Sequence, residues 1–292
     1  TLKSCREYFF DQAKQRNVNI VMIVGNHDTF FKNTNDVNSP GLLLQDYDNI
    51  TAYSGPVEYG FDGLSILLMP WICTDNYREC MDALKLSFSP VCFGHFEIAG
   101  FTMYKGHESH DGFSPDLFLS YDLVCSGHFH HRSSRGNISY LGNPYELTWA
   151  DYDDPRGFHV LDTETRELTF IENPFKMFKK VWYNDQHAKL MEKIDVNEYK
   201  DCILKVIVTQ KNNPYFFDRF IDSIEKVNPI EIQIVEDHLN LGMEDDQDIV
   251  NEAESTVEIF KKYIQASESK GVDKNKVEAK IIELYHEAIE LE

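Results

Sequence analysis

The sequence has little positive charge and no long apolar run, and each shortage excludes a class of protein. Lys and Arg total 28 against 49 Asp and Glu, which gives a formal net charge of −21 at pH 7. A surface of this sign repels phosphate backbones, so the chain alone is a poor non-specific nucleic-acid binder. Any nucleic-acid substrate must be attracted by bound metal ions, local basic residues or a partner. No apolar run approaches the ~18 residues of a membrane span, and no signal peptide is visible.

Paired cysteines are also lacking. The six cysteines form no Cys-x-x-Cys motif. Most lie in apolar runs, such as those around Cys92 and Cys125, which is typical of reduced, buried thiols in a cytoplasmic protein. The cysteines are Cys5, Cys73, Cys80, Cys92, Cys125 and Cys202.

The remaining composition is that of an ordinary globular protein. Its 292 residues are 42% hydrophobic and 13% aromatic, enough for one sizeable core and one or two smaller modules. Composition divides it into four parts, which we predict to be a main α/β domain, a small α+β module, an acidic linker and a helical tail. Their ranges are 1–177, 178–236, 237–253 and 254–292.

In the main domain, short apolar runs alternate with helical patterns. The runs predict buried strands, each leading into a polar loop. A helix is predicted between the second and third strands, and a hairpin turning near 163–165 closes the domain. The predicted strands are 20–24, 64–69, 91–93 and 123–125, the helix is 75–87 and the hairpin is 157–171.

The remaining parts carry weaker signals. In the small module the pattern predicts a strand at 202–208, a helix at 214–227 and a strand at 230–235. The tail predicts two helices, 254–268 and 273–290, each with apolar residues on one face. Such a face suits docking on another protein. The alternative is that the tail packs back on the chain's own core.

Three strand-end motifs carry the chemistry. The first strand runs into Gly25-Asn26-His27-Asp28, the third into Gly94-His95, and the fourth into Gly127-His128-Phe129-His130. Open α/β sheets build their sites at the carboxyl ends of strands. In an extended segment His128 and His130 would point to the same side, so that two imidazoles straddle a pair of metal ions.

Each motif also has a structural interpretation. A lone Gly-His, as at His95, is more often a hydrogen-bonded loop histidine, and His-x-His alone is equivocal. Asn-His-Asp after a buried strand has little value for packing. Three such motifs in this order, each behind its own strand, favour a metal site.

The order of these motifs resembles the later motifs of the calcineurin-like metallophosphoesterases. The segment Ser139–Glu146 followed by Asp154–Phe158 is similar to the G-(S/T)-P … (K/R)-G-F signature of one branch, the SbcD-type nuclease subunit of the double-strand-break repair complex, which includes bacteriophage members. The resemblance is specific from the first helix to about residue 175. It implies an α/β metallophosphoesterase sandwich with a capping module at 178–236 that orients DNA.

The resemblance also implies roles for individual residues. Asn26, His95 and His128 would ligate one Mn²⁺ and His130 a second, with Mg²⁺ as the alternative metal. His27 would act on the transition state or protonate the leaving oxygen, and Asp28 would cap or orient its loop.

The implied function is an exo- or endonuclease for double-stranded DNA in recombination and repair. The implied partners are an SMC-like ATPase bound through 254–292 and a second copy of the chain. The implied location is the cytoplasm, that of the host for a phage protein.

The sequence departs from the family in one respect. The family's Asp-x-His and Gly-Asp-x-x-Asp motifs, which supply the bridging carboxylate, do not precede Gly25. We therefore expect an absent N-terminal part, and an active enzyme only in the full-length protein. Two alternatives remain open: a phosphatase or phosphodiesterase on the same fold, and a non-catalytic fragment that acts as a partner-binding scaffold.

Overall fold

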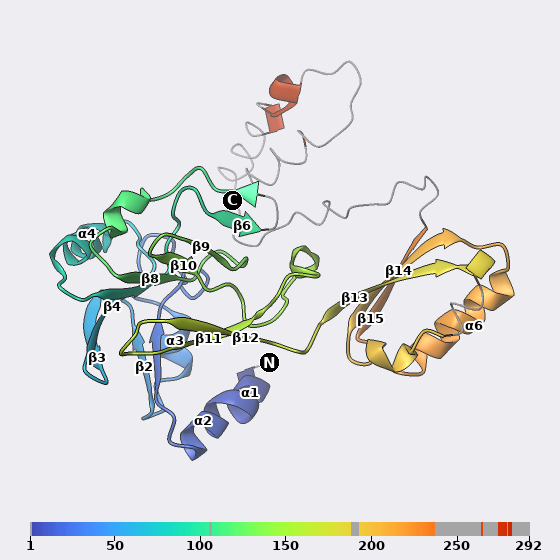
Figure 1. The fold of residues 1–292 in the computed structure, drawn as a ribbon, viewed down its shortest axis with the longest axis horizontal. Helices are drawn as coiled ribbons and strands as arrows, with labels where there is room; N and C mark the ends of the chain where they lie inside the picture. The colour runs from blue at the N-terminus through green and yellow to red at the C-terminus, as the bar shows by residue number, and fades with distance from the viewer. Residues whose placement is uncertain are drawn as a thin grey trace. The chain divides into compact units, whose positions relative to one another are not determined.

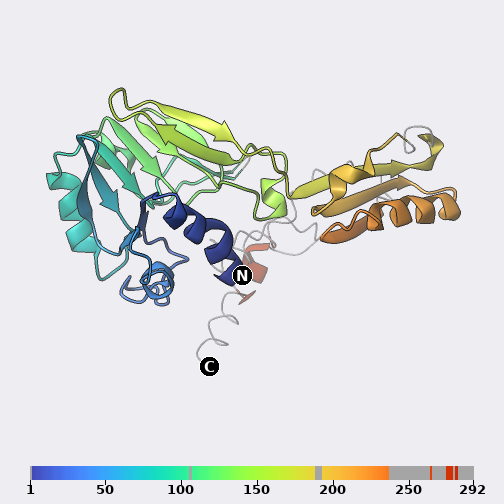
Figure 2. The same cartoon turned by 90° about the horizontal axis from the view of Figure 1, so that it is seen from below.

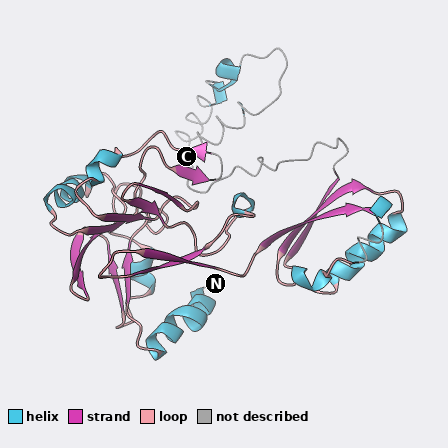
Figure 3. Cartoon of the chain, in the orientation of Figure 1, coloured by secondary structure: helices cyan, strands magenta, loops and turns pink. Residues whose placement is uncertain are grey.

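The chain forms two compact units, Thr1–Glu236 and Asp237–Glu292. The computed structural model describes residues 2–104, 107–187, 193–236, 264, 274–278 and 280–281. Figure 1 shows the ribbon, and Figure 3 shows the helices and strands. Among the described helices, none is long and apolar enough to cross a membrane.

The largest sheet of the first unit has six strands in the order β3-β4-β5-β8-β10-β9. Its central strands β4, β5, β8 and β10 are parallel, whereas β3 and β9 run antiparallel at the two edges. The parallel strands therefore end at one edge of the sheet, where the motif loops begin. The strands are β3 (Val57–Phe61), β4 (Leu64–Met69), β5 (Val91–Gly94), β8 (Leu123–Ser126), β9 (Ser133–Arg135) and β10 (Ile138–Tyr140).

The central strands β4, β5 and β8 are buried on both faces, because their side chains alternate between two faces that are each covered by other elements. Leu67 and Met69 of β4 face a core that includes Cys80 and Leu84 of helix α4 (Tyr77–Leu86). The other face packs against the two-stranded sheet of β1 (Ile20–Ile23) and β2 (Ile50–Tyr53) and against the hairpin of β11 (Gly157–Leu161) and β12 (Leu168–Glu172). Figures 1 and 2 show the hairpin on the side away from α4. This layered α/β arrangement is consistent with the expected metallophosphoesterase-like fold.

The N-terminal helix covers the outer side of β1 and β2. It consists of α1 (Leu2–Cys5), a π-helical turn η1 (Arg6–Phe10) and α2 (Asp11–Gln15). Phe10 packs with Leu44 and Tyr47 against Ile20, Met22 and Ile50. β1 is thus held from both sides, which fixes the loop that follows it. Shorter elements complete the domain: α3 (Ser39–Leu43), β6 (Thr102–Tyr104), β7 (His107–Glu108), η2 (Pro115–Phe118) and η3 (Trp149–Asp151).

The second module of this unit has a three-stranded parallel sheet, on which helix α6 (Pro214–Glu225) packs. Its strands are β13 (Phe178–Asn184), β14 (Ile203–Gln210) and β15 (Glu231–Glu236), in that order. Helix α6 lies along them, as Figure 3 shows, and Asn213 caps its first turn. Leu204, Val206 and Ile224 are the centre of its core. Two short turns, η4 (Asp185–His187) and η5 (Val196–Tyr199), complete it.

The predicted strands, the helix near 75–87 and the closing hairpin are all present, with ends shifted by a few residues. β13 is not predicted by the sequence because Lys179, Lys180 and Trp182 interrupt its apolar pattern; Phe178, Val181 and Tyr183 are its buried side chains. The predicted linker 237–253 lies outside the described residues. So do most of the two predicted tail helices, of which 264, 274–278 and 280–281 are described as helical.

Candidate metal centre

The three predicted motifs meet in space. β5 and β8 are neighbours in register, Gly94 opposite Ser126, and the Gly127 amide donates to the Gly94 carbonyl at 2.9 Å. The loop after β1 reaches the same place, since the Asn26 Oδ1 lies 2.8 Å from the His95 Nε2. The carboxyl ends of three strands therefore deliver their side chains to one point.

The glycine of each motif leaves room for an aromatic ring. Gly25 and Gly127 face the His95 ring, and Gly94 faces the Phe96 ring. A Cβ on Gly25 would lie 3.1 Å from the His95 ring, and one on Gly127 would lie 3.0 Å from its Nδ1. A Cβ on Gly94 would lie 2.1 Å from the Phe96 ring. The His95 imidazole thus fits between two glycines. This steric requirement explains why each motif begins with glycine.

His128 occupies the centre of the group in an unusual backbone conformation. Its φ of 77° is left-handed, which costs free energy for a residue with a Cβ. Our expectation of an extended segment at His128–His130 is therefore wrong, because the chain bends sharply after Gly127. The bend places the His128 ring 5.2 Å from that of His95, centroid to centroid. Its buried Nδ1 has no hydrogen-bond partner among the described residues.

The two central imidazoles, His95 and His128, are held neutral at pH 7. Burial, followed by the charges of His27 and His130, lowers the pKa of His95 to about 4. Burial, followed by the charges of His95, His27 and His130, lowers the pKa of His128 to about 3. His27 and His130 are thus close enough to affect both central imidazoles. A neutral imidazole offers the lone pair that a metal ion needs.

Trp71, which the sequence did not indicate, forms a wall of the group. Its indole lies 5.3 Å from the His128 ring and 6.0 Å from the His95 ring, centroid to centroid. Its backbone is fixed from three sides: its N–H donates to Val24, and its carbonyl accepts from Asn35 and Asn76. The indole therefore holds both imidazoles from one side.

His27 and Asp28 differ from the other members. His27 is exposed, whereas Asn26 and Asp28 are half-buried. Asp28 folds back on its own loop, where its Oδ2 accepts from the Gly25 amide at 2.8 Å and its Oδ1 from the Ser39 hydroxyl at 3.2 Å. Asp28 thus has the contacts of a residue that closes and orients the loop of Asn26 and His27.

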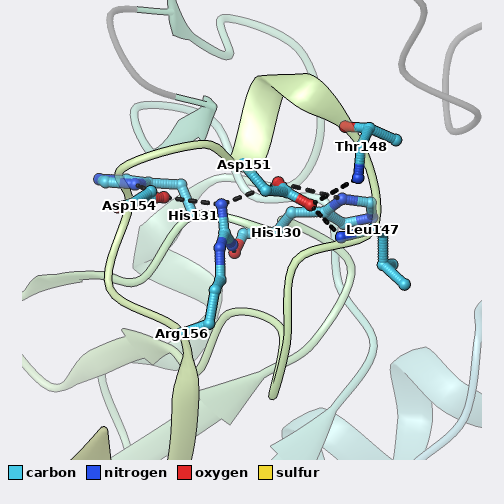
Figure 4. Close-up of polar contacts among 7 residues, drawn as sticks. All are labelled: His130, His131, Leu147, Thr148, Asp151, Asp154 and Arg156. Atoms are coloured by element: carbon cyan, nitrogen blue, oxygen red, sulfur yellow. Dashed lines mark hydrogen bonds and ion pairs between the residues drawn. The ribbon is translucent and has the colours of Figure 1, made fainter. Parts of the chain in front are cut away.

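His130 lies beside a buried ionic network, which Figure 4 shows. Its Nδ1 is 4.0 Å from the Asp151 Oδ1, and its carbonyl accepts from the Arg156 guanidinium. Arg156 joins Asp151 at 2.8 Å and Asp154 at 2.7 Å, and Asp154 lies 2.8 Å from the His131 Nδ1. Arg156 belongs to the signature segment that the sequence shares with the SbcD branch, but nothing in the sequence pointed to Asp151.

The donors present suit a divalent cation. An amide oxygen and an imidazole nitrogen only 2.8 Å apart, with an unpartnered imidazole nitrogen nearby, are donors that Mn²⁺ accepts. No cluster of three or more His, Cys, Asp or Glu side chains in the described part of the chain has metal-binding geometry by itself. The group fits a metal as a partial ligand set, because one of its members is an asparagine and the carboxylate of a two-metal site is not among its residues.

The Asn-His, Gly-His and Gly-His-x-His motifs thus gather at the ends of β1, β5 and β8, an arrangement consistent with a protein of the metallophosphoesterase-like class. The chain is 36% identical over 244 residues to exonuclease subunit 1 of Enterobacteria phage T4, a match that covers 84% of this chain and 69% of that protein. It is 28% identical over 156 residues to the SbcD subunit of the SbcCD nuclease of Staphylococcus epidermidis, covering 48% of this chain and 37% of that protein. No family model matches the chain. The chain belongs to the SbcD-type nuclease family, as the resemblance implied.

Proposed function

We propose that this chain belongs to the nuclease subunit of a DNA recombination and repair complex, and that the full-length subunit hydrolyses DNA phosphodiester bonds with two Mn²⁺ ions, or Mg²⁺ in their place. The observation that supports this most is the 2.8 Å approach of the Asn26 Oδ1 to the His95 Nε2, beside the unpartnered His128 Nδ1. These three atoms would bind one ion, and His130 would bind the other. Bound there, the ions supply positive charge that lowers the pKa of water and neutralises the phosphate.

The protein's own groups would then act around that centre. His27, the exposed imidazole of the group, is free to reach the scissile phosphate and to donate a proton to the leaving oxygen. Asp28 holds the His27 loop through the Gly25 amide and Ser39. Trp71 excludes water from one side of the two imidazoles.

The charge of the chain supports a role as one subunit of a complex. Because the net charge is −21, the surface of the chain does not attract DNA, and bound ions or a partner must do so. We propose that an SMC-like ATPase binds through 254–292, that the subunit acts as a homodimer in the cytoplasm, and that the module 178–236 orients duplex DNA. Co-purification of the ATPase with wild-type and tail-deleted protein tests the first point; equal recovery with both would contradict it.

Mn²⁺ titration followed by tryptophan fluorescence tests the metal assignment. The chain has three tryptophans, and Trp71 lies against both imidazoles, so a paramagnetic ion bound there quenches its emission. We expect saturable quenching that Trp71→Phe removes, while calorimetry shows that the variant still binds Mn²⁺. Quenching that persists in Trp71→Phe would place the ion elsewhere.

Cleavage assays with the protein in its complex test the reaction. We expect His27→Ala to keep Mn²⁺ binding and to lose most cleavage of duplex DNA, because the residue acts on the transition state. Turnover of a phosphomonoester faster than of DNA would favour the phosphatase alternative instead.

A further inference from the structure

The loop of His130 and His131 rests on buried charges that lie outside the proposed ligands. The Arg156 side chain is 3% exposed, and the side chains of Asp151 and Asp154 are 2% and 7% exposed. One guanidinium joins both carboxylates and also donates to the His130 carbonyl. Burying such charges is costly unless each is paired, so a network of this kind holds its members in one arrangement.

We propose that Asp151, held by Arg156, is the positioning residue of His130 and sets which ring nitrogen carries its proton. This inference rests on the proposed function, in which His130 is a metal ligand. The carboxylate faces Nδ1 at 4.0 Å, longer than a hydrogen bond but close enough for its charge to favour a proton on Nδ1. The lone pair is then left on Nε2, where a metal would bind. Ligating histidines commonly have such a carboxylate behind them.

The two carboxylate oxygens of Asp151 have different partners. Oδ2 accepts from the backbone amides of Leu147 at 2.8 Å and Thr148 at 3.2 Å, which closes the turn η3. Oδ1 faces Arg156 and His130. The same carboxylate thus fixes its own turn and, through the other oxygen, the imidazole.

The segment η3 is itself anchored on the β13–β15 module. Glu146, one residue before Leu147, accepts from the amides of Met177 and Phe178. The Trp149 ring lies 4.9 Å from that of Phe178, centroid to centroid, and the Lys205 ammonium lies 4.3 Å from the Trp149 centroid. Asp151 is therefore held on a short segment that both modules stabilise, as a positioning residue has to be.

Asp151→Asn is the sharpest test because it keeps the shape of the side chain and replaces one acceptor oxygen by an NH₂ donor. The amide oxygen faces Leu147 and Thr148, whose N–H groups need an acceptor, so the NH₂ group takes the place of Oδ1, facing His130 and losing the ion pair with Arg156. A donor at that place favours the lone pair on Nδ1 and the proton on Nε2. Asp154→Asn is the matched control, since it removes a buried carboxylate from the same arginine but contacts His131.

Long-range ¹H–¹⁵N spectra of metal-free, histidine-labelled protein at pH 7.5 report the tautomer, with the His130 signal assigned from a His130→Ala sample. We expect the proton on Nδ1 in the wild type and in Asp154→Asn, and on Nε2 in Asp151→Asn. The same tautomer in all three, or the same change in both variants, would overturn the proposal. If Asp151→Asn does not fold, Arg156→Lys replaces it. A lysine cannot reach both carboxylates and the His130 carbonyl, so mixed tautomers are expected, and an unchanged spectrum would overturn the proposal.

Mn²⁺ binding by the subunit in its complex separates this inference from the proposed function. We expect Asp151→Asn to weaken the binding that depends on His130 by about 10- to 100-fold, and Asp154→Asn to leave it unchanged. If His130→Ala does not change Mn²⁺ binding, the metal assignment is wrong, whatever the tautomers show. If His130→Ala weakens binding and Asp151→Asn does not, only the positioning role is wrong.

Discussion

The two larger sheets of the first unit, the six-stranded sheet and β13–β15, both contain parallel strands, and they differ in what lies at the ends of those strands. At the ends of β5 and β8, and of β1 beside them, glycines are followed by histidines and an asparagine that converge on one point. At the ends of β13, β14 and β15, the polar side chains serve the module itself: Asp185 accepts from the amide of Asn213, the cap of α6, and Lys211 pairs with Glu236. Strand direction alone therefore does not make a site.

The difference lies in steric room and in how many donors meet at one point. In the first sheet, Gly25 and Gly127 leave space for the His95 ring, and the His128 Nδ1 is left buried without a partner in the described structure. In the second, the Asp185 Oδ2 accepts from the amide of Asn213, although the Asp185 Oδ1 and the Tyr183 hydroxyl are also buried without a partner in the described structure. What sets the His128 Nδ1 apart is its place beside the Asn26 and His95 side chains, where several donors to a metal ion meet.

Removing the central imidazole should have the largest effect. We expect His128→Ala to weaken Mn²⁺ binding by at least about 100-fold, more than the loss of a residue that only supports a ligand. DNA cleavage should fall with it. Calorimetry with Mn²⁺ measures the change, and His110→Ala, at an exposed histidine, is the control. Equal affinity in the two variants would remove His128 from the metal site.

A cavity in the second module should affect stability without affecting metal. Leu204 of β14 is fully buried, so Leu204→Ala should lower the free energy of unfolding by about 2–5 kcal/mol. Urea denaturation measures the loss. Ile230→Ala, at a residue that is 64% exposed in the same module, should change it by no more than about 0.5 kcal/mol. Weaker Mn²⁺ binding by folded Leu204→Ala would show that the two regions are coupled more tightly than the comparison implies.

A smaller change tests the role of the glycines. A methyl group at Gly127 would lie 3.0 Å from the His95 Nδ1, so Gly127→Ala should cost about 1–3 kcal/mol through overpacking and should weaken Mn²⁺ binding. Gly55→Ala is matched, because a Cβ there meets nothing within 4 Å. Thermal unfolding and calorimetry of the two variants should therefore differ. If both behave as wild type, the glycines are not there to make room for His95.

The smallest expected effect concerns the thiols. Cys5 is exposed and the other five cysteines are buried. Burial raises the pKa of both Cys80 and Cys125 to about 12, so these thiols stay protonated and unreactive at pH 8. Labelling of the native protein with a thiol reagent should show one rapid equivalent, which Cys5→Ser removes with no loss of stability. A second rapid equivalent would reveal local opening of a core.

The sequence by itself predicted the motif-bearing strands and the residues Asn26, His95 and His128 that meet at their ends. The strand Ile20–Ile23 is apolar throughout and Leu64–Met69 is apolar except at Ser65, and these patterns do not depend on distant partners. The strand Phe178–Asn184 could not be predicted, because its lysines become compatible with a sheet only when Lys180 lies against Tyr152 and Trp149.

Only the tertiary structure decided how the site is held. The left-handed turn at His128 replaces the extended segment that alternation predicted, because the chain must bend to bring that imidazole to His95. Trp71 and Asp151 lie 57 residues (128 − 71) and 23 residues (151 − 128) from His128 along the chain, and no local pattern connects them to it. Periodicity reports which face of an element is buried, whereas the partner of a buried charge or ring is set by packing between elements.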